Sequence, residues 1–157
     1  MLKVSFVRAR YPSVWEPTNL MYVSAFIKNK YKGNLEVQIL DGFFDSDEQI
    51  LNKISGSDYV GFSGTTPQVP HIKKLSKLVK KEYPSMKTIA GGYGPSLQPF
   101  TFLNDSTIDY LIVGEGEQSM LDILNGVTTE KLVSNKPIMD IDSIPNPDRD
   151  SIDLNRY

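Results

Sequence analysis

The sequence predicts an α/β fold, in which one parallel sheet carries helices on both faces. Five short runs rich in β-branched and aromatic residues alternate with longer stretches whose apolar residues recur at helical spacing. Five strand–helix units in succession favour parallel strands, because each helix returns the chain to the start of the next strand. The length of 157 residues, with 39% hydrophobic and 23% charged residues, suits one domain with a real core.

The strands are expected where short apolar runs end in glycine or a small polar residue. In the second run, Val37 and Ile39 alternate with polar neighbours, as on a half-buried strand. The predicted strands are Leu2–Val7, Leu35–Leu40, Asp58–Gly64, Met86–Gly92 and Ile108–Gly114.

Helices are expected in the gaps between these strands. The clearest pattern precedes Pro84, where the apolar residues from Val69 to Val79 share one face and lysines occupy the opposite arc. A lysine-rich arc is typical of a solvent-facing helix surface, although it could also be a docking patch. The predicted helices are Thr18–Tyr31, Asp47–Ile54, Gln68–Glu82, Ser96–Leu103 and Glu117–Leu124.

Composition excludes several classes of function. The net charge of −2 gives no indication of a nucleic-acid surface, and no apolar run approaches the roughly 20 residues of a membrane span. The first residues lack the features of a signal peptide, so we expect a cytoplasmic protein with no membrane partner. The chain has no cysteine and one histidine, His71, which excludes thiolate zinc sites, iron–sulfur ligation by this chain and a multi-histidine metal site.

The composition changes near Lys136, where the sequence becomes rich in proline and aspartate. We therefore expect an α/β domain over residues 1–135 and a linker or wrapping arm over residues 136–157.

Ligands of open parallel sheets bind beyond the carboxyl ends of the strands. Here these loops combine glycines, hydroxyls and aromatic side chains, a shelf suited to a large, partly polar ligand that approaches the backbone closely. The candidate site residues are Tyr11, Trp15, Ser63, Gly64, Thr65, Thr66, Gly91, Gly92, Tyr93, Gly94, Ser96, Gly114, Glu115 and Gly116.

Each of these features also has a purely structural interpretation. The hydroxyls of the third loop could cap a helix, the glycines could build a left-handed turn, and Glu115 and Glu117 suit the first turn of a helix. His71 is more often a structural residue than a ligand at such a position. A phosphate-binding interpretation is weak, because the loop after the first strand has no glycine and no G-x-x-x-x-G-K-[ST] segment occurs.

The order and spacing of these segments resemble the N-terminal cobalamin-binding domain of B12-dependent radical SAM proteins. That family shows V-G-[IF]-S-x-x-T, G-G-x-H-x-T-x-x-P and D-[YF]-x-[VI]-x-G-E-G-E, then I-P-x-P-D-R-D-L-[IL]-D-L-x-x-Y. This sequence has "VGFSGTT", "GGYGPSLQP", "DYLIVGEGE" and "IPNPDRDSIDLNRY" in the same order. The match spans nearly the whole chain, and the last two segments are its most specific parts.

The resemblance implies a flavodoxin-like (Rossmann-like), doubly wound, five-stranded parallel sheet in the order 2-1-3-4-5. It also implies that the dimethylbenzimidazole tail of cobalamin enters a slot between the sheet and a helix. In that arrangement the glycines leave room for the tail, and the hydroxyls of the third loop bind the tail or the nucleotide loop. Tyr11 and Trp15 would then lie beside the corrin ring.

Two departures from related patterns matter. The frequent histidine of the family's glycine loop corresponds to Gly94, and its threonine to Ser96. The D-x-H-x-x-G segment of the B12 mutases, whose histidine ligates cobalt, is replaced by "RARYPSVW". The resemblance therefore implies base-off cobalamin without a protein histidine on cobalt.

The resemblance further implies a partner domain. A radical SAM barrel, with its [4Fe-4S] cluster and S-adenosylmethionine, would follow this module in a methyltransferase or an anaerobic cyclase. The module alone would not be catalytic. Two alternatives stay open: a cofactor-free scaffold of the same family, and a flavodoxin-like binder of a nucleotide or flavin.

Overall fold

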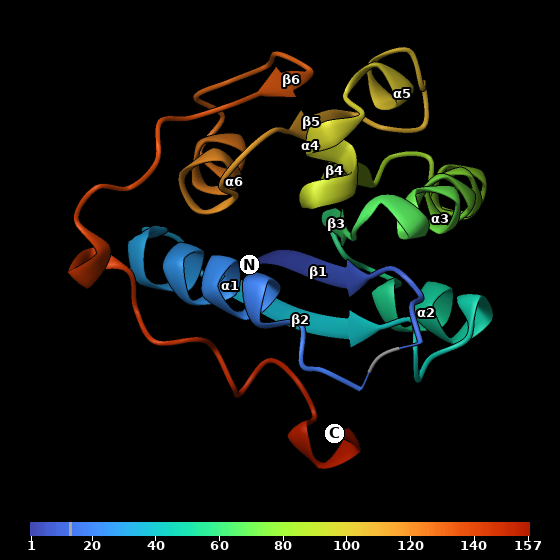
Figure 1. Ribbon diagram of the computed structural model, residues 1–157, viewed down its shortest axis with the longest axis horizontal. Helices are drawn as coiled ribbons and strands as arrows, with labels where there is room; N and C mark the ends of the chain where they lie inside the picture. Colours follow the sequence, from blue (N-terminus) through green and yellow to red (C-terminus); the bar gives the residue numbers. More distant parts are fainter. Residues whose placement is uncertain (13) are drawn as a thin grey trace.

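The computed structural model describes residues 1–12 and 14–157. In this part of the chain, parallel strands form one sheet in the order β2-β1-β3-β4-β5-β6, with helices on both faces (Figure 1). This confirms the doubly wound, flavodoxin-like arrangement. The strands are β1 (Leu2–Arg8), β2 (Leu35–Asp41), β3 (Tyr59–Ser63), β4 (Lys87–Gly91), β5 (Tyr110–Ile112) and β6 (Leu132–Val133).

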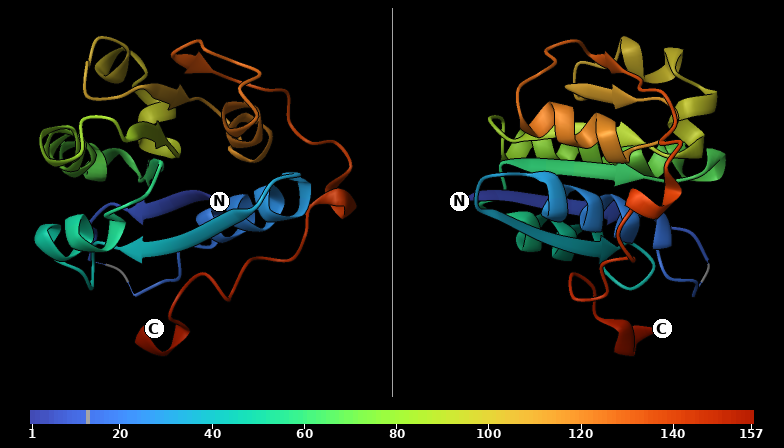
Figure 2. Two further views of the ribbon diagram at one scale, coloured as in Figure 1. Left: turned by 180° about the vertical axis from the view of Figure 1, so that it is seen from behind. Right: turned by 90° about the vertical axis from the view of Figure 1, so that its left-hand side faces the viewer.

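Two groups of helices bury the two faces of the sheet. α1 and α6 cover one face, and α2 and α3 cover the other (Figures 1 and 2). The start of α2 is fixed by a capping box, in which Ser46 and Gln49 each bind the other's backbone N–H through their side chains. The helices are α1 (Thr18–Lys30), α2 (Asp47–Ile54), α3 (Val69–Glu82), α4 (Tyr93–Leu97), α5 (Phe100–Leu103) and α6 (Glu117–Leu124).

The structure corrects the prediction in two places. The described residues form six strands rather than five, because Leu132–Val133 pairs with β5; two residues are too few to show a strand pattern in the sequence. The single helix expected over Ser96–Leu103 is instead two short helices, α4 and α5, with Pro99 at their junction. Proline has no N–H for the helical hydrogen-bond ladder, so the chain turns there.

The strand register brings the loops of interest to one edge. Arg8 lies opposite Asp41 on one side and Ser63 on the other, and Ser63 lies opposite Gly91. The connections that follow these strands therefore leave the sheet side by side, as parallel strands require.

The C-terminal residues form an arm that crosses α1 and ends beside β2 (Figure 2). The Asp148 N–H donates to the carbonyl oxygen of Met21 at 3.0 Å, and the Ile39 N–H donates to the carbonyl oxygen of Ser151 at 2.8 Å. The arm thus covers part of the outer edge of β2, where no strand of the described residues pairs with it. The division into a domain over 1–135 and an arm over 136–157 stays a prediction.

None of the helices formed by the described residues is long and apolar enough to cross a membrane.

Candidate functional site

A pocket of about 760 Å³ opens at the carboxyl edge of the sheet, between the sheet and helices α1 and α6. Its buried walls are mostly apolar: Phe6, Ile89 and Ile112 come from strands, and Leu20 and Met120 come from helices. More exposed polar side chains complete its lining. These are Arg8, Glu16, Asn19, Thr65, Ser96, Glu115 and Glu117. Such a pocket suits a ligand with both an apolar part and polar groups.

Eleven of the fourteen residues predicted from the sequence line this pocket. They are Tyr11, Ser63, Gly64, Thr65, Gly91, Gly92, Tyr93, Ser96, Gly114, Glu115 and Gly116. The other three lie outside it. Trp15 is 80% exposed, Thr66 is exposed in the 3-10 turn that precedes α3, and Gly94 is buried in α4. The binding roles of all fourteen residues stay predictions.

The three glycines at the end of β4 and in the loop after it lie in different surroundings. Gly92 has φ +89°, and a Cβ atom there would lie 2.7 Å from the Ser63 Oγ atom. Gly94 lets α4 pack on the preceding loop, because a Cβ atom there would lie 2.6 Å from the carbonyl oxygen of Thr65. Gly91 differs from both, since its nearest non-neighbouring atom would be the Cβ atom of Ile112 at an ordinary 3.7 Å. Of these three glycines, only Gly91 therefore has room for a side chain.

Phe6 and Gly61 form a part of the pocket wall that sequence reasoning missed. A Cβ atom on Gly61 would lie 2.8 Å from Cδ1 of Phe6. The Phe6 ring can therefore pack over Gly61 only because Gly61 has no side chain. Gly61 occupies an interior strand position, where glycine often marks a close approach. The sequence carried that signal.

Polar side chains hold the loops of the pocket in place. Gln68 Oε1 accepts from the Thr65 N–H at 2.7 Å, and its Nε2 donates to the carbonyl oxygen of Ala9. Asn19 Nδ2 donates to Ser63 Oγ at 2.9 Å and ties α1 to the end of β3. The T-x-x-Q spacing from Thr65 is the sequence signal from which the role of Gln68 could have been inferred. Nothing in the sequence pointed to Asn19, because its partner is 44 residues away.

The loop after β5 also contacts the C-terminal arm. The Gly114 N–H donates to Ser96 Oγ at 3.1 Å, and Glu115 Oε2 accepts from the Ile138 N–H at 3.1 Å. Glu117 lies in the first turn of α6, where a carboxylate is favoured by the helix dipole. The helix dipole therefore accounts for Glu117 by itself. Glu117 also lines the pocket.

His71 is the chain's one histidine and lies outside the pocket lining. Its Nδ1 accepts from the Arg10 N–H at 2.7 Å, so Nε2 carries the ring proton toward Asp47 Oδ1 at 2.9 Å. Arg10 and Lys74 also pair with Asp47. Burial alone would raise the pKa of Asp47, but hydrogen bonds from Lys74 and His71 outweigh it and lower that pKa to about 2. His71 thus joins the loop after β1 to α2 and α3.

The model of the B12 binding domain family matches residues 4–124. The chain belongs to this family. The matched range contains most of β1, all of β2 to β5 and the loops that line the pocket.

Two curated proteins are similar to this chain in sequence. The chain is 25% identical over 147 residues to the anaerobic magnesium-protoporphyrin IX monomethyl ester cyclase of Rubrivivax gelatinosus, covering 86% of this chain. It is 32% identical over 143 residues to the cytidylyl-2-hydroxyethylphosphonate methyltransferase of Streptomyces wedmorensis, covering 73% of this chain. In each case it spans 26% of the relative's length.

Solved structures share the fold. The radical S-adenosylmethionine methyltransferase TsrM of Kitasatospora setae superposes with a TM-score of 0.68 at 19% identity, over 80% of this chain and 25% of that one. The receiver domain of the stress response regulator RcsB of Escherichia coli superposes with a TM-score of 0.54 at 13% identity, over 86% of this chain and 98% of that one. The family match thus identifies a B12 binding domain, and the same fold also occurs in a receiver domain, a protein of another kind.

Proposed function

We propose that this chain binds cobalamin as a module of a B12-dependent radical SAM enzyme, with the nucleotide tail in the pocket between the sheet and helices α1 and α6. The observation that carries the proposal is the pocket itself, which opens at the edge where the family motifs meet. Its volume of about 760 Å³ lies within the range of pockets that enclose cofactors and other small ligands.

The chemistry of the lining fits the tail of cobalamin. An apolar base would pack among Phe6, Ile89 and Ile112, and burial of this surface would supply most of the binding free energy. The hydroxyls of Ser63 and Thr65 would bind the tail or the nucleotide loop that connects it to the corrin. The glycine loops after β4 and β5 would leave room for the tail or bring backbone N–H groups to it. Their glycines on the pocket lining are Gly91, Gly92, Gly114 and Gly116.

We further propose that cobalamin binds base-off and without a protein histidine on cobalt. His71 lies outside the pocket lining, and both of its ring nitrogens already have partners. Tyr11 lines the mouth of the pocket, and Trp15 is exposed on the same loop, where both could contact a corrin ring. The protein side chains would then contact the corrin by packing and hydrogen bonding.

The parent enzyme would be of the methyltransferase or anaerobic cyclase type, as the names of the relatives suggest. Cobalamin would supply the transfer of a methyl group or of electrons at cobalt, and this chain would bind and orient it. The [4Fe-4S] cluster and S-adenosylmethionine would belong to a radical SAM barrel elsewhere in the parent enzyme, because this sequence contains no cysteine to ligate a cluster.

The test is direct binding. The purified chain is mixed with hydroxocobalamin, desalted and scanned for the absorbance of base-off cobalamin. We expect retained cofactor at a stoichiometry near one, with the base-off spectrum. A folded protein that retains none would contradict the proposal and favour the cofactor-free scaffold, whereas a yellow, flavin-bearing preparation would favour the flavodoxin-like binder.

A further inference from the structure

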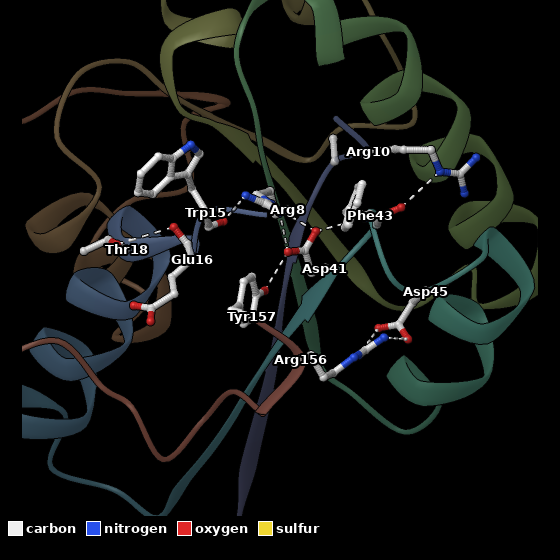
Figure 3. Close-up of polar contacts among 12 residues, drawn as sticks. Arg8, Arg10, Trp15, Glu16, Thr18, Asp41, Phe43, Asp45, Arg156 and Tyr157 are labelled. Carbon is white, nitrogen blue, oxygen red and sulfur yellow. Dashed lines mark hydrogen bonds and ion pairs between the residues drawn. The ribbon is translucent and has the colours of Figure 1, made fainter. Parts of the chain in front are cut away.

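The C-terminal arm ends against the pair formed by Arg8 and Asp41, at the ends of β1 and β2 (Figure 3). The Tyr157 hydroxyl donates to Asp41 Oδ2 at 2.6 Å. Burial and this hydrogen bond both raise the pKa of the Tyr157 hydroxyl, so it remains a donor throughout the neutral range. The side chain of Asp41 is only 2% exposed, so Arg8 and Tyr157 supply the polar contacts that water gives an exposed carboxylate.

Arg8 connects this pair to the loop after β1. Its Nε donates to Asp41 Oδ1 at 3.0 Å, and its Nη2 lies 2.5 Å from Asp41 Oδ2. Its Nη1 donates to the carbonyl oxygen of Trp15 (Figure 3). One rigid, planar guanidinium therefore holds both the arm-facing carboxylate and the loop backbone. Arg8 also lines the pocket.

Neighbouring contacts hold the end of the arm in this position. Arg156 binds both carboxylate oxygens of Asp45 at 3.0 and 3.2 Å, and its guanidinium lies 4.7 Å from the centre of the Phe44 ring. The Phe44 and Tyr157 rings meet edge to face, with their centres 5.0 Å apart. Lys53 shares Asp45 at 2.8 Å. The arm end is thus a folded part of the protein.

We propose that docking of the arm end positions the loop after β1 at the mouth of the pocket, with Tyr157 as a positioning residue that acts through Asp41 and Arg8. Undocking would admit water to the Arg8–Asp41 pair, weaken it by screening, and release the guanidinium that holds the Trp15 carbonyl. The loop that bears Tyr11 and Trp15 would then be ordered less of the time.

The proposal has a reciprocal consequence, which rests on the proposed cobalamin binding. If the docked arm favours the ligand-ready loop, bound cobalamin must favour the docked arm by the same factor. A domain fused beyond the arm would in this way sense whether the pocket is filled.

The test uses three variants of the full chain: Tyr157→Phe, the double substitution Tyr157→Ala with Arg156→Gln, and the control Tyr83→Phe. The control removes a tyrosine hydroxyl that donates to the carbonyl oxygen of Leu51 at 3.1 Å, away from the arm. Trp15 is the only tryptophan, so its time-resolved anisotropy reports the motion of the loop without any ligand. Amide hydrogen exchange reports the loop and the arm in parallel.

We expect the double variant to show faster depolarisation of Trp15, faster exchange of the loop amides, and a hydroxocobalamin Kd about fivefold or more above that of the control, within the usual size of coupling between sites. Tyr157→Phe should change the same three readouts in the same direction by less. Hydroxocobalamin should slow arm exchange in the unsubstituted protein.

Loop anisotropy and loop exchange equal to the control, in a double variant whose arm exchanges freely, would overturn the proposal. These two readouts decide the inference even if the protein binds no cobalamin, whereas that result alone would contradict the proposed function.

Discussion

A methyl group on Gly92 would lie 2.7 Å from the Oγ atom of Ser63, at the point where the loops after β3 and β4 meet beside the pocket. The backbone of Gly92 is also in the left-handed region, with φ +89°. Gly114 has the same φ, but a Cβ atom there would meet nothing within 4 Å. The two glycines therefore separate backbone strain from steric crowding.

We predict that Gly92→Ala destabilises the protein by about 2–4 kcal/mol and Gly114→Ala by only about 1 kcal/mol. Both variants carry the cost of a positive φ, and Gly92→Ala adds a clash with the Ser63 side chain and the Gly64 backbone. Urea unfolding followed by circular dichroism measures both. An equal loss of stability in the two variants would contradict the steric crowding inferred at Gly92.

The pocket should be closed by a side chain at Gly91. Gly91→Val keeps an allowed strand conformation and adds methyl groups next to Ile112, so we expect the stability to change by about 1 kcal/mol or less. Hydroxocobalamin affinity should fall at least about tenfold, since the added volume occupies the space proposed for the tail. Lys87→Val at the exposed opposite end of β4 is the matched control and should bind as the unsubstituted chain does. Unchanged affinity in a folded Gly91→Val protein would place the ligand elsewhere.

Asp47 should make the stability depend on pH in the acid range. Its pKa of about 2 in the folded protein lies below the value of about 4 for an unfolded aspartate. Its contribution is therefore complete above pH 4 and is lost as the pH falls from 4 to 2. Between pH 4 and pH 2, the Asp47→Asn variant should lose about 1 kcal/mol less stability than the unsubstituted protein, a figure that allows for solvent screening. The exposed neighbour Glu48, changed to Gln, is the control, and urea unfolding at several pH values is the measurement. A variant that follows the same curve as the control would disprove this role.

Asp148 should hold the middle of the arm on the domain. Its carboxylate accepts from Lys28, Ser24 and Ser151, and burial opposes its charge less than these partners favour it, so its pKa is lowered. Removing the charge in Asp148→Asn should increase proteolytic cleavage within residues 136–157 several-fold and cost about 1–3 kcal/mol. Asp142→Asn, at an exposed position of the same arm, should leave cleavage unchanged. Equal cleavage of the two variants would show that the arm docks without this carboxylate.

The sequence alone determined the parallel α/β class, the first five strands, the bounds of α2 and α6, and eleven of the residues that line the pocket. It could do so because strand and helix periodicities are local, and because parallel strands end at one common edge whatever their order. The family motifs then supplied the strand order.

Only the tertiary structure decided how distant segments meet. The contacts of Asn19 with Ser63, Phe6 with Gly61, and Tyr157 with Asp41 join residues 44, 55 and 116 positions apart along the chain, at distances no local pattern encodes. The arm illustrates this most clearly: its composition predicted a linker or wrapping segment. Its docked position follows from buried charges and strand-edge groups that find their partners only once the sheet has formed.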